Sequence, residues 1–505
     1  MKLSNKHQEP SPSVIVREDF SGGLNVTFNA DGIAENQLIV AENVEAERNT
    51  GRLKTVAGTI EVLKSFYEIF AAMYDGINKV ILIVYTDKTV RIFNPKTEII
   101  SNPVGTLSGS LYPVSTAWEN GLLIASGGKL QYFNGTALIT LTDSYDSTFV
   151  FTREGRVITT SPDNVVRFSA DGDEETWTHD TDVEAKGQWV KVSYKDGGQI
   201  IGMLNLANDI LILKNNRRVY KLSGEFPDWQ ISEVSRNVEC SGRLSFCSVL
   251  GSVFILGKNV FQNLQPAQFY GEVKAENVGR LVVKEIQKLP ENAKVRFVPP
   301  LNQIWCIGTG GVVMMFDLNF NAWFKRKFNS AVIDVISIGD AVLIVKTDKI
   351  SILSEDTFFD DDEALRWKFQ AQRLTAHDDF LLKRTQISII PFTSDLYTGQ
   401  ISVGAVRVPL PVPKRNVKIF GNKSKIYKNH FAIPFAARKL GTHVEGDKIF
   451  DNINFIFGND TKIFSQPTFI KESRNVYRSK FLDIKGFGEG GGFLLNRIMF
   501  DVVEV

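Results

Sequence analysis

Zinc sites use histidine or cysteine side chains at short, defined spacings, and this sequence has few of either. No two of its five histidines have the spacing of a metal site: His7, His179, His377, His430 and His443. Cys240 and Cys247 are not at a zinc spacing, and Cys306, between Trp305 and Ile307, is interpreted as a buried strand thiol. Three cysteines, an odd number, argue against a disulfide framework and favour a reducing compartment.

Clusters of carboxylates can bind calcium or act in acid–base catalysis, but the two clusters in this sequence lack the spacing of a calcium-binding loop. Asp171–Glu175 and Asp360–Glu363 do not have the loop spacing of an EF-hand calcium site. The glycine-rich segment Gly486–Gly492 lacks the Lys-Ser/Thr pair of a phosphate loop and is interpreted as a turn between strands. We therefore expect no catalytic, metal-binding or cofactor-binding residues and no cofactor. A glycan-cleaving enzyme remains an alternative, because sequence alone does not show the separation of paired carboxylates.

A dense basic cluster lies towards the C-terminal end of a nearly neutral chain. The 58 Lys and Arg residues almost balance the 57 Asp and Glu residues, so a charge-driven partner has to meet a local patch. No acidic residue interrupts the nine basic residues of this cluster: Arg407, Lys414, Arg415, Lys418, Lys423, Lys425, Lys428, Arg438 and Lys439. Like charges repel unless they are spread over a surface or face an anion. The hypothesis is that this basic patch faces DNA phosphates or an acidic neighbouring subunit, and a solvated face is the alternative.

The elements that position any site are predicted to be β-hairpins. Two short apolar strands flank a polar turn in most of seven segments: 80–95, 121–136, 155–172, 209–224, 252–264, 303–318 and 341–356. They recur at intervals of roughly 35 to 55 residues, which suits one four-stranded antiparallel sheet per repeat. Each such sheet has a face that only a neighbouring sheet can bury. Helical signal is weak, and its best candidates are Gly58–Ala72 and Gln37–Val44.

The repeats predict an all-β protein with a β-propeller of about seven modules, six to eight being compatible with the pattern, over residues 61–360. Two β-sandwiches built from the same hairpins are the alternative. Residues 1–60 are expected to form an arm that joins a β-rich platform domain made by residues 361–505, or else a disordered arm. The acidic run Phe359–Glu363 is interpreted as a solvated linker between the domains. No apolar run is long enough for a membrane helix.

Large aromatic residues follow several of the turns. VVRFSADGDEETW, residues 165–177, places a tryptophan directly after an acidic turn. Trp177, Trp229 and Trp323 are predicted to anchor neighbouring sheets, since a buried indole removes a large apolar area from water. Gly22–Gly23 and Asn29–Gly32 are expected to be turns that let residues 19–59 reach the C-terminal domain.

Several segments together resemble one protein family. The segment DFSGGLNVTFNADGIAENQLIVAENVEAERNTGRLKTVAGT, residues 19–59, is similar to the entry sequence of tail nozzle or tail hub proteins of short-tailed, podovirus-like bacteriophages, including its F-x-GG-[LIV] element. Asn43, Gly51, Leu53 and Gly58 match the pattern that follows. VVRFSADGDEETW, VYKLSGEFPDW (219–229) and GGVVMMFDLNFNAWFKR (310–326) resemble internal elements of these proteins, and FLDIKGFGEGGGFLLNRIMFDVVEV (481–505) resembles their closing strands.

This resemblance implies a structural protein of the virion tail rather than an enzyme. It implies a ring of the chain with itself, usually of six copies, at the distal end of the tail. The implied partners are an adaptor or portal-side tail protein, tail fibres in some members, and the double-stranded phage DNA that the ring retains and then releases. Assembly would take place in the host cytoplasm. A receptor-binding tail protein is a further alternative.

Overall fold

The computed structural model describes residues 13–178, 186–192, 196–206, 209–266, 273–391, 398–410, 469–473 and 477–504. The chain divides into two compact units. One unit, the propeller unit, comprises residues 61–314 and 330–352, and the other, the platform unit, comprises residues 1–60, 315–329 and 353–505. The predicted domains were 1–60, 61–360 and 361–505.

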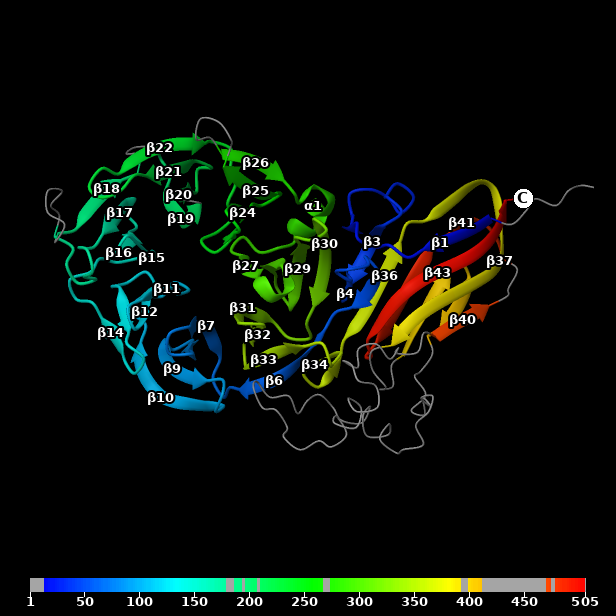
Figure 1. Ribbon diagram of the computed structural model, residues 1–505, viewed down its shortest axis with the longest axis horizontal. Helices are drawn as coiled ribbons and strands as arrows, with labels where there is room; N and C mark the ends of the chain where they lie inside the picture. The colour runs from blue at the N-terminus through cyan, green and yellow to red at the C-terminus, as the bar shows by residue number, and fades with distance from the viewer. Residues whose placement is uncertain are drawn as a thin grey trace, which may run out of the picture. The chain divides into compact units, whose positions relative to one another are not determined.

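Seven antiparallel sheets form the propeller unit, and each begins with an innermost strand. In chain order the innermost strands are β7 (Ile69–Asp75), β11 (Val114–Trp118), β15 (Phe149–Arg153), β19 (Ile200–Leu206), β23 (Phe246–Val249), β27 (Lys294–Val298) and β31 (Val332–Ile338). Figure 1 shows these strands arranged around the centre of a ring. The ring closes, because β31 of the seventh sheet packs against β7 of the first.

The second and third strands of every sheet are the hairpins read from the sequence. The second strands are β8 (Val80–Tyr85), β12 (Gly121–Ala125), β16 (Arg156–Thr160), β20 (Asp209–Lys214), β24 (Ser252–Leu256), β28 (Gln303–Ile307) and β32 (Ala341–Lys346). The third strands are β9 (Thr89–Asn94), β13 (Gln131–Phe133), β17 (Val165–Phe168), β21 (Val219–Ser223), β25 (Phe261–Pro266), β29 (Val312–Asp317) and β33 (Lys349–Ser354). Outer strands complete six sheets: β10 (Ile99–Thr106), β14 (Leu138–Thr140), β18 (Gln188–Lys191), β22 (Gln230–Ser235), β26 (Val273–Asn277) and, in the seventh sheet, β6 (Gly58–Lys64).

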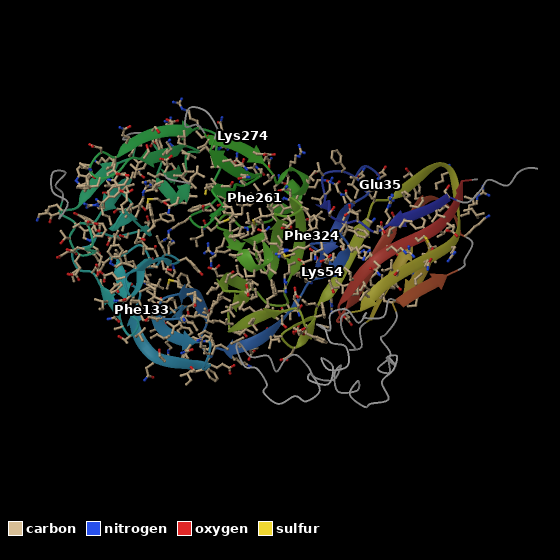
Figure 2. The ribbon with its side chains drawn as sticks, viewed as in Figure 1. Glu35, Lys54, Phe133, Phe261, Lys274 and Phe324 are labelled. Atoms are coloured by element: carbon tan, nitrogen blue, oxygen red, sulfur yellow. The ribbon has the colours of Figure 1, made fainter. Side chains whose placement is uncertain are left out.

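Buried apolar side chains lie between neighbouring sheets, as a propeller requires. One cluster joins Leu82 and Val84 of the first sheet to Ile124 of the second, and another joins Leu343 of the seventh sheet to Ile83 of the first. Phe133 and Phe261 on third strands are fully buried, whereas Lys274 on β26 is exposed (Figure 2). The predicted propeller is confirmed by these seven sheets and their packing.

The platform unit consists of two sheets built from both ends of the chain. The first contains β1 (Ser13–Arg17), β4 (Val44–Ala46), β5 (Leu53–Thr55), β37 (Leu374–Pro391), β40 (Phe469–Ser473), β41 (Tyr477–Leu482) and β43 (Phe493–Glu504). The second contains β2 (Gly23–Leu24), β3 (Gln37–Glu42), β30 (Ala322–Lys327), β36 (Arg366–Ala371), β38 (Thr398–Val403), β39 (Val406–Pro409) and β42 (Ile484–Glu489). The first sheet packs on the second through Phe493 and Trp367, whose ring centroids are 4.8 Å apart.

The N-terminal segment is integral to this platform. Residues 13–17 pair with β43 from Ser13 opposite Val502 to Arg17 opposite Ile498, and β3 pairs with β36. Gly23 has a φ of 61°, and a Cβ there would lie 2.7 Å from the carbonyl oxygen of Trp323, so glycine is required at this turn. The predicted platform formed by both ends of the chain is therefore confirmed.

Two expectations about local structure are wrong. Gly58–Ala72 and Gln37–Val44 are not helical but contribute to β6, β7 and β3, because their apolar faces are buried by neighbouring strands. The helical segments among the described residues are η1 (Arg280–Val282), α1 (Val283–Ile286) and η2 (Pro299–Leu301).

The acidic run Phe359–Glu363 is also not a solvated linker. It forms the hairpin of β34 (Phe359–Asp360) and β35 (Glu363–Ala364), in which Asp360 is only 3% exposed. Asp360 accepts hydrogen bonds from the Thr59 hydroxyl at 2.6 Å and the Asn329 backbone N–H at 2.6 Å. These donors stabilise a carboxylate that would otherwise be costly to bury.

Candidate functional site

Polar side chains from several sheets meet at one end of the ring, where the innermost strands begin. The central cluster consists of Tyr112, Arg243, Lys294, Arg296 and Asp334. Lys294 and Arg296 lie on β27, Asp334 lies on β31, and Tyr112 and Arg243 precede β11 and β23. A propeller's blades surround a central channel, so the starts of the innermost strands form one mouth of that channel.

Local backbone features aim two of these side chains. A register shift interrupts the pairing of β31 between Val332 and Asp334, and bulges of this kind redirect side chains. Gly242, before Arg243, is packed so closely that a Cβ would lie 2.6 Å from Oδ1 of Asn292. The turn before β23 is further tied to the turn before β27, because Ser245 Oγ donates a hydrogen bond to the Ala293 carbonyl at 2.7 Å.

Arg243 bridges sheets across the centre of the ring. From the segment leading into the fifth sheet, its Nε donates to the carbonyl oxygen of Thr148 at 3.0 Å, and its Nη2 donates to the same oxygen. Its Nη1 donates to the carbonyl oxygen of Tyr112, and its guanidinium lies 4.8 Å from the ring centroid of Phe149. Because Tyr112 leads into the second sheet and Thr148 into the third, a single side chain spans the channel mouth.

Arg296 and Asp334 form the ion pair of the cluster. Arg296 donates two hydrogen bonds to Asp334, from Nε at 2.9 Å and from Nη2 at 3.0 Å, and the Tyr112 hydroxyl donates to the same carboxylate. Burial acts to raise the pKa of Asp334, but Arg296 and Lys294 outweigh it and hold the pKa below its usual range. Burial and the neighbouring Asp334 raise the pKa of Tyr112, which stays a protonated donor at neutral pH.

Lys294 carries a charge in a poorly solvated position. Its Nζ donates a hydrogen bond to the carbonyl oxygen of Ile333 at 2.7 Å and lies 3.4 Å from the ring centroid of Tyr112. Burial lowers the pKa of Lys294 to about 8, with Asp334 opposing and Arg296 adding to the effect. Burial and the nearby Arg296 lower the pKa of Arg243 to about 10.

The central cluster therefore has more positive than negative charge. It contains three cations, Arg243, Lys294 and Arg296, and one carboxylate, Asp334, which gives an excess of two positive charges. The arrangement bridges the mouth of the channel with side chains and gathers three partly buried cations there, whose hydrogen bonds go to backbone carbonyls and to Asp334. Sequence analysis missed this site because its members are up to 222 residues apart and share no local motif.

Of the predicted anchors, Trp177 lies between the second and third sheets. It is 7% exposed and packs in one cluster with Leu123 of the second sheet and Val157 of the third. The acidic turn positions it, because the Glu174 carbonyl accepts a hydrogen bond from the Trp177 indole at 2.8 Å. The Glu174 carboxylate also accepts one from the Trp118 indole at 3.0 Å.

The other two tryptophans have different environments. Trp229 stacks on Phe168 with ring centroids 4.9 Å apart and packs against the cluster that joins the third and fourth sheets. Trp323 lies in β30 of the platform unit, where it is 2% exposed and its ring centroid is 5.1 Å from that of Phe316. Trp323 is thus a core residue of the platform unit.

The predicted basic patch falls almost entirely outside the described residues. Arg407 is exposed on β39, and the other eight residues of the patch lie outside the described ranges. The cysteines are free thiols, and burial raises the pKa of Cys240 and of Cys247 to about 12, while Cys306 is fully buried in β28. In the described part of the chain, no group of three or more His, Cys, Asp or Glu side chains is placed to hold a metal ion.

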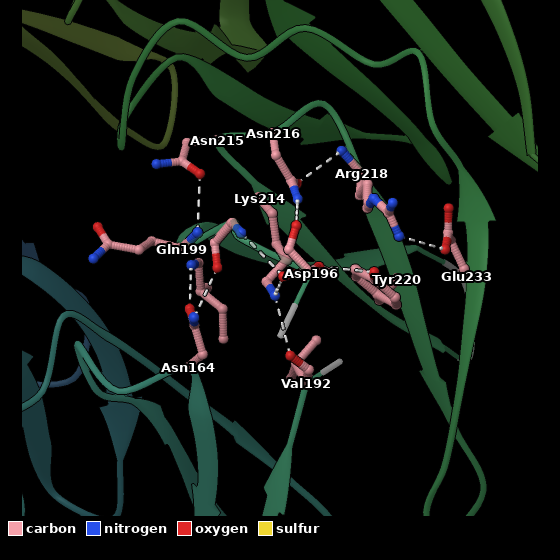
Figure 3. Close-up of polar contacts among 12 residues, drawn as sticks. Asn164, Val192, Asp196, Gln199, Lys214, Asn215, Asn216, Arg218, Tyr220 and Glu233 are labelled. Atoms are coloured by element: carbon pink, nitrogen blue, oxygen red, sulfur yellow. Dashed lines mark hydrogen bonds and ion pairs between the residues drawn. The ribbon is translucent and has the colours of Figure 1, made fainter. Parts of the chain in front are cut away.

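A second polar network lies between the third and fourth sheets (Figure 3). Lys214 and Asp196 form a buried ion pair at 2.7 Å, and Lys214 also donates to the Val192 carbonyl at 3.1 Å. The Tyr220 hydroxyl donates to Asp196 at 2.9 Å, and the Gly198 N–H donates to it at 3.0 Å. With its donors and acceptors satisfied by one another, this network has the character of a structural connection.

A depression of about 360 Å³ lies at the opposite ends of β11 and β15. Its lining includes the carboxylates Glu119 and Glu154, and Glu154 accepts from the Nε of Arg153 at 2.9 Å. Both glutamates are at turn positions with positive φ. Among the described residues, this depression is one place where paired carboxylates could be tested for a glycan-cleaving activity.

The chain is a β-propeller protein by its own sheets, and comparisons with known proteins add only likeness of fold. Searches of protein-family profiles and of curated proteins returned no match. Among solved structures, the chain is similar to the WD40 β-propeller domain of Doa1, with 12% identity and a TM-score of 0.41 over 59% of this chain and 97% of that one. It is also similar to BamB from Moraxella catarrhalis, with 11% identity and a TM-score of 0.37 over 68% of this chain and 96% of that one. No helix in the described ranges is long and apolar enough to cross a membrane.

Proposed function

We propose that this chain is a structural subunit of the distal tail of a short-tailed bacteriophage, where copies of it close into a ring that retains and then releases the packaged DNA. The resemblance of residues 19–59 and 481–505 to tail nozzle proteins supports this proposal. The observation that carries it is the platform, in which both of these terminal segments are paired strands of one domain.

The platform gives the chain the mechanical character that ring assembly needs. β5 and β1 from the N-terminal segment both pair with β43, which is the last strand of the chain. In this proposal the platform acts as a rigid body, whose different surfaces form heterologous contacts that close into a ring. The propeller unit is likewise a closed ring of sheets.

The central cluster bears on where DNA would pass. Arg243 spans the mouth of the propeller's own channel, and its hydrogen bonds to Thr148 and Tyr112 hold it there. In this proposal the DNA path is therefore enclosed by the ring of subunits and not by the channel of one propeller. The contacts along such a path would be to phosphates and independent of base sequence.

The test compares assembly with turnover. The full chain is purified, its mass in solution is measured by light scattering across a range of protein concentrations, and the same sample is screened for hydrolysis of bacterial surface glycans. The proposal predicts a ring-sized oligomer without glycan hydrolysis. A monomer at every concentration would count against it.

If the chain hydrolyses a glycan and Glu119→Gln or Glu154→Gln abolishes that activity, the enzyme alternative holds instead. Both carboxylates line the depression at the ends of β11 and β15. Asp163→Asn is the matched control, since Asp163 is a surface carboxylate that pairs with Arg167 outside this depression. Saturable adsorption of the purified chain to bacterial cells would support the receptor-binding alternative.

A further inference from the structure

We propose that the central cluster is a binding site for a phosphate dianion, either inorganic phosphate or a phosphate monoester. This inference does not depend on the proposed function, because it concerns the charge and geometry of one cluster in the propeller unit.

Part of the positive charge of the central cluster has no carboxylate partner among the described residues. Asp334 accepts hydrogen bonds from Nε and Nη2 of Arg296 and from the Tyr112 hydroxyl. Arg243 and Lys294 donate instead to backbone carbonyls, and in the part of the chain that the structure describes neither forms an ion pair with a carboxylate. Carbonyl oxygens satisfy N–H donors but do not neutralise a full positive charge.

Partial burial of these charges costs free energy of folding. Arg243 and Lys294 are half-buried, and Arg296 exposes 26% of its side chain, so all three retain access to solvent from the channel mouth. Charges that are partly removed from water and lack a counter-ion destabilise the folded chain. An anion that enters from solvent would relieve this cost, and its binding would stabilise the folded state by mass action.

The charge of the site indicates which anion it would bind. The cluster has an excess of two positive charges, as counted above. A carboxylate or a phosphodiester brings one negative charge, whereas a phosphate monoester brings about −1.5 to −2 at neutral pH. Guanidinium groups also match the oxygen geometry of phosphate. A dianion is therefore the ligand that balances the site.

The test uses thermal unfolding of the full chain at near-neutral pH and constant ionic strength. Inorganic phosphate, glycerol 3-phosphate, dimethyl phosphate and acetate are each titrated to millimolar concentration. We expect the unfolding temperature to rise in a saturable way with a phosphate dianion and to change little with dimethyl phosphate or acetate. A response to both dianions identifies the monoester class, and a response to inorganic phosphate alone identifies free phosphate as the ligand.

Variants assign the effect to the cluster. Lys294→Met should weaken phosphate binding by about tenfold or more, because a hydrogen-bonded charge is lost. Lys258→Met, which removes an exposed lysine from the turn between β24 and β25, should bind as the unaltered chain does. Arg243→Gln is a second variant should the first fail to fold. Equal shifts of the unaltered chain with all four anions, or equal phosphate binding by Lys294→Met and Lys258→Met, would overturn the proposal.

Discussion

Lys294 shows how one side chain ties the central cluster to the stability of the chain. Its pKa is about 8 in the folded state, against an ordinary value of 10.5. Below pH 8 it is charged in both the folded and the unfolded chain, and the cost of burying that charge is then fully present. Between the two pKa values the unfolded chain binds more protons, so stability rises with pH over this window.

We expect the free energy of unfolding of the unaltered chain, relative to Lys294→Met, to increase by up to about 3 kcal/mol between pH 8 and 10.5. Urea unfolding at a series of pH values measures this difference. Taking the difference removes the common contributions of the groups that face Lys294, which are Tyr112, Arg296 and Asp334, with Arg243 and Cys247 nearby. A difference that stays constant over the window would show that Lys294 is solvated.

The buried ion pair between the third and fourth sheets supplies a second prediction. Asp196→Asn removes the carboxylate that pairs with Lys214, whose side chain is 0% exposed. We expect a loss of about 3 to 5 kcal/mol in the free energy of unfolding. Asp163→Asn is the matched control, because Asp163 pairs with Arg167 but exposes 52% of its side chain, and its loss should stay below about 1 kcal/mol. Equal effects of the two changes would contradict the assigned role of the pair.

Acid should have the same effect on this pair as the substitution. Burial acts to raise the pKa of Asp196, but hydrogen bonds from Lys214, Gly198 and Tyr220 outweigh it and lower the pKa from 3.8 to about 2. The stabilisation by Asp196 is therefore present above pH 3.8 and is lost as the pH falls towards 2. Urea unfolding over this range should show a steeper loss in the unaltered chain than in Asp196→Asn.

At the level of elements, the tryptophan after the acidic turn joins two sheets. Trp177→Ala should cost about 3 to 5 kcal/mol, because it removes a buried indole between the second and third sheets. Trp189, which is 45% exposed on β18 of the same third sheet, provides the control, and Trp189→Ala should cost much less. Thermal unfolding monitored by circular dichroism compares the two variants. Similar losses of stability in both would show that Trp177 does not anchor the second sheet to the third.

The middle hairpins could be read from the sequence because their signals are local. In the segment 80–95, two short apolar runs flank Thr86–Lys88, and the structure places β8 and β9 on either side of that turn. The innermost and outer strands were harder to predict, since their pattern depends on which neighbouring sheet covers them. In the platform unit, Gln37–Glu42 was ambiguous for a related reason: its apolar residues suit a helix or a strand, and pairing with β36 decides between the two.

The central cluster could not have been predicted, because its charged residues come from segments that only ring closure brings together. Arg243 bonds to Thr148 across 95 residues of sequence, and Tyr112 bonds to Asp334 across 222. The contacts of Trp177 could be predicted in part, because the acidic turn and the indole are adjacent in sequence. The hydrogen bond from the Trp118 indole to the Glu174 carboxylate could not be predicted, because those two residues are distant in sequence.

For the whole molecule, the paired ends predict that residues 1–60 are not dispensable. Their removal would remove β1, β2, β3, β4 and β5 from the two sheets of the platform unit. We expect a chain without residues 1–60 to expose apolar surface and to aggregate or lose its platform, and limited proteolysis of the full chain should leave residues 19–59 protected. A truncated chain that folds and assembles as the full chain does would contradict the role given to the platform.

The central claim is that the chain is a structural part of a phage tail, and its location in the particle tests that most directly. The measurement is electron cryo-microscopy of phage particles produced from the genome that encodes the chain, with a small tag fused to the N-terminus as a marker. We predict a closed ring of copies at the distal end of the tail, with each propeller and platform fitting the density as described here. Particles that lack the chain, or that carry it away from the tail end, would contradict the proposal.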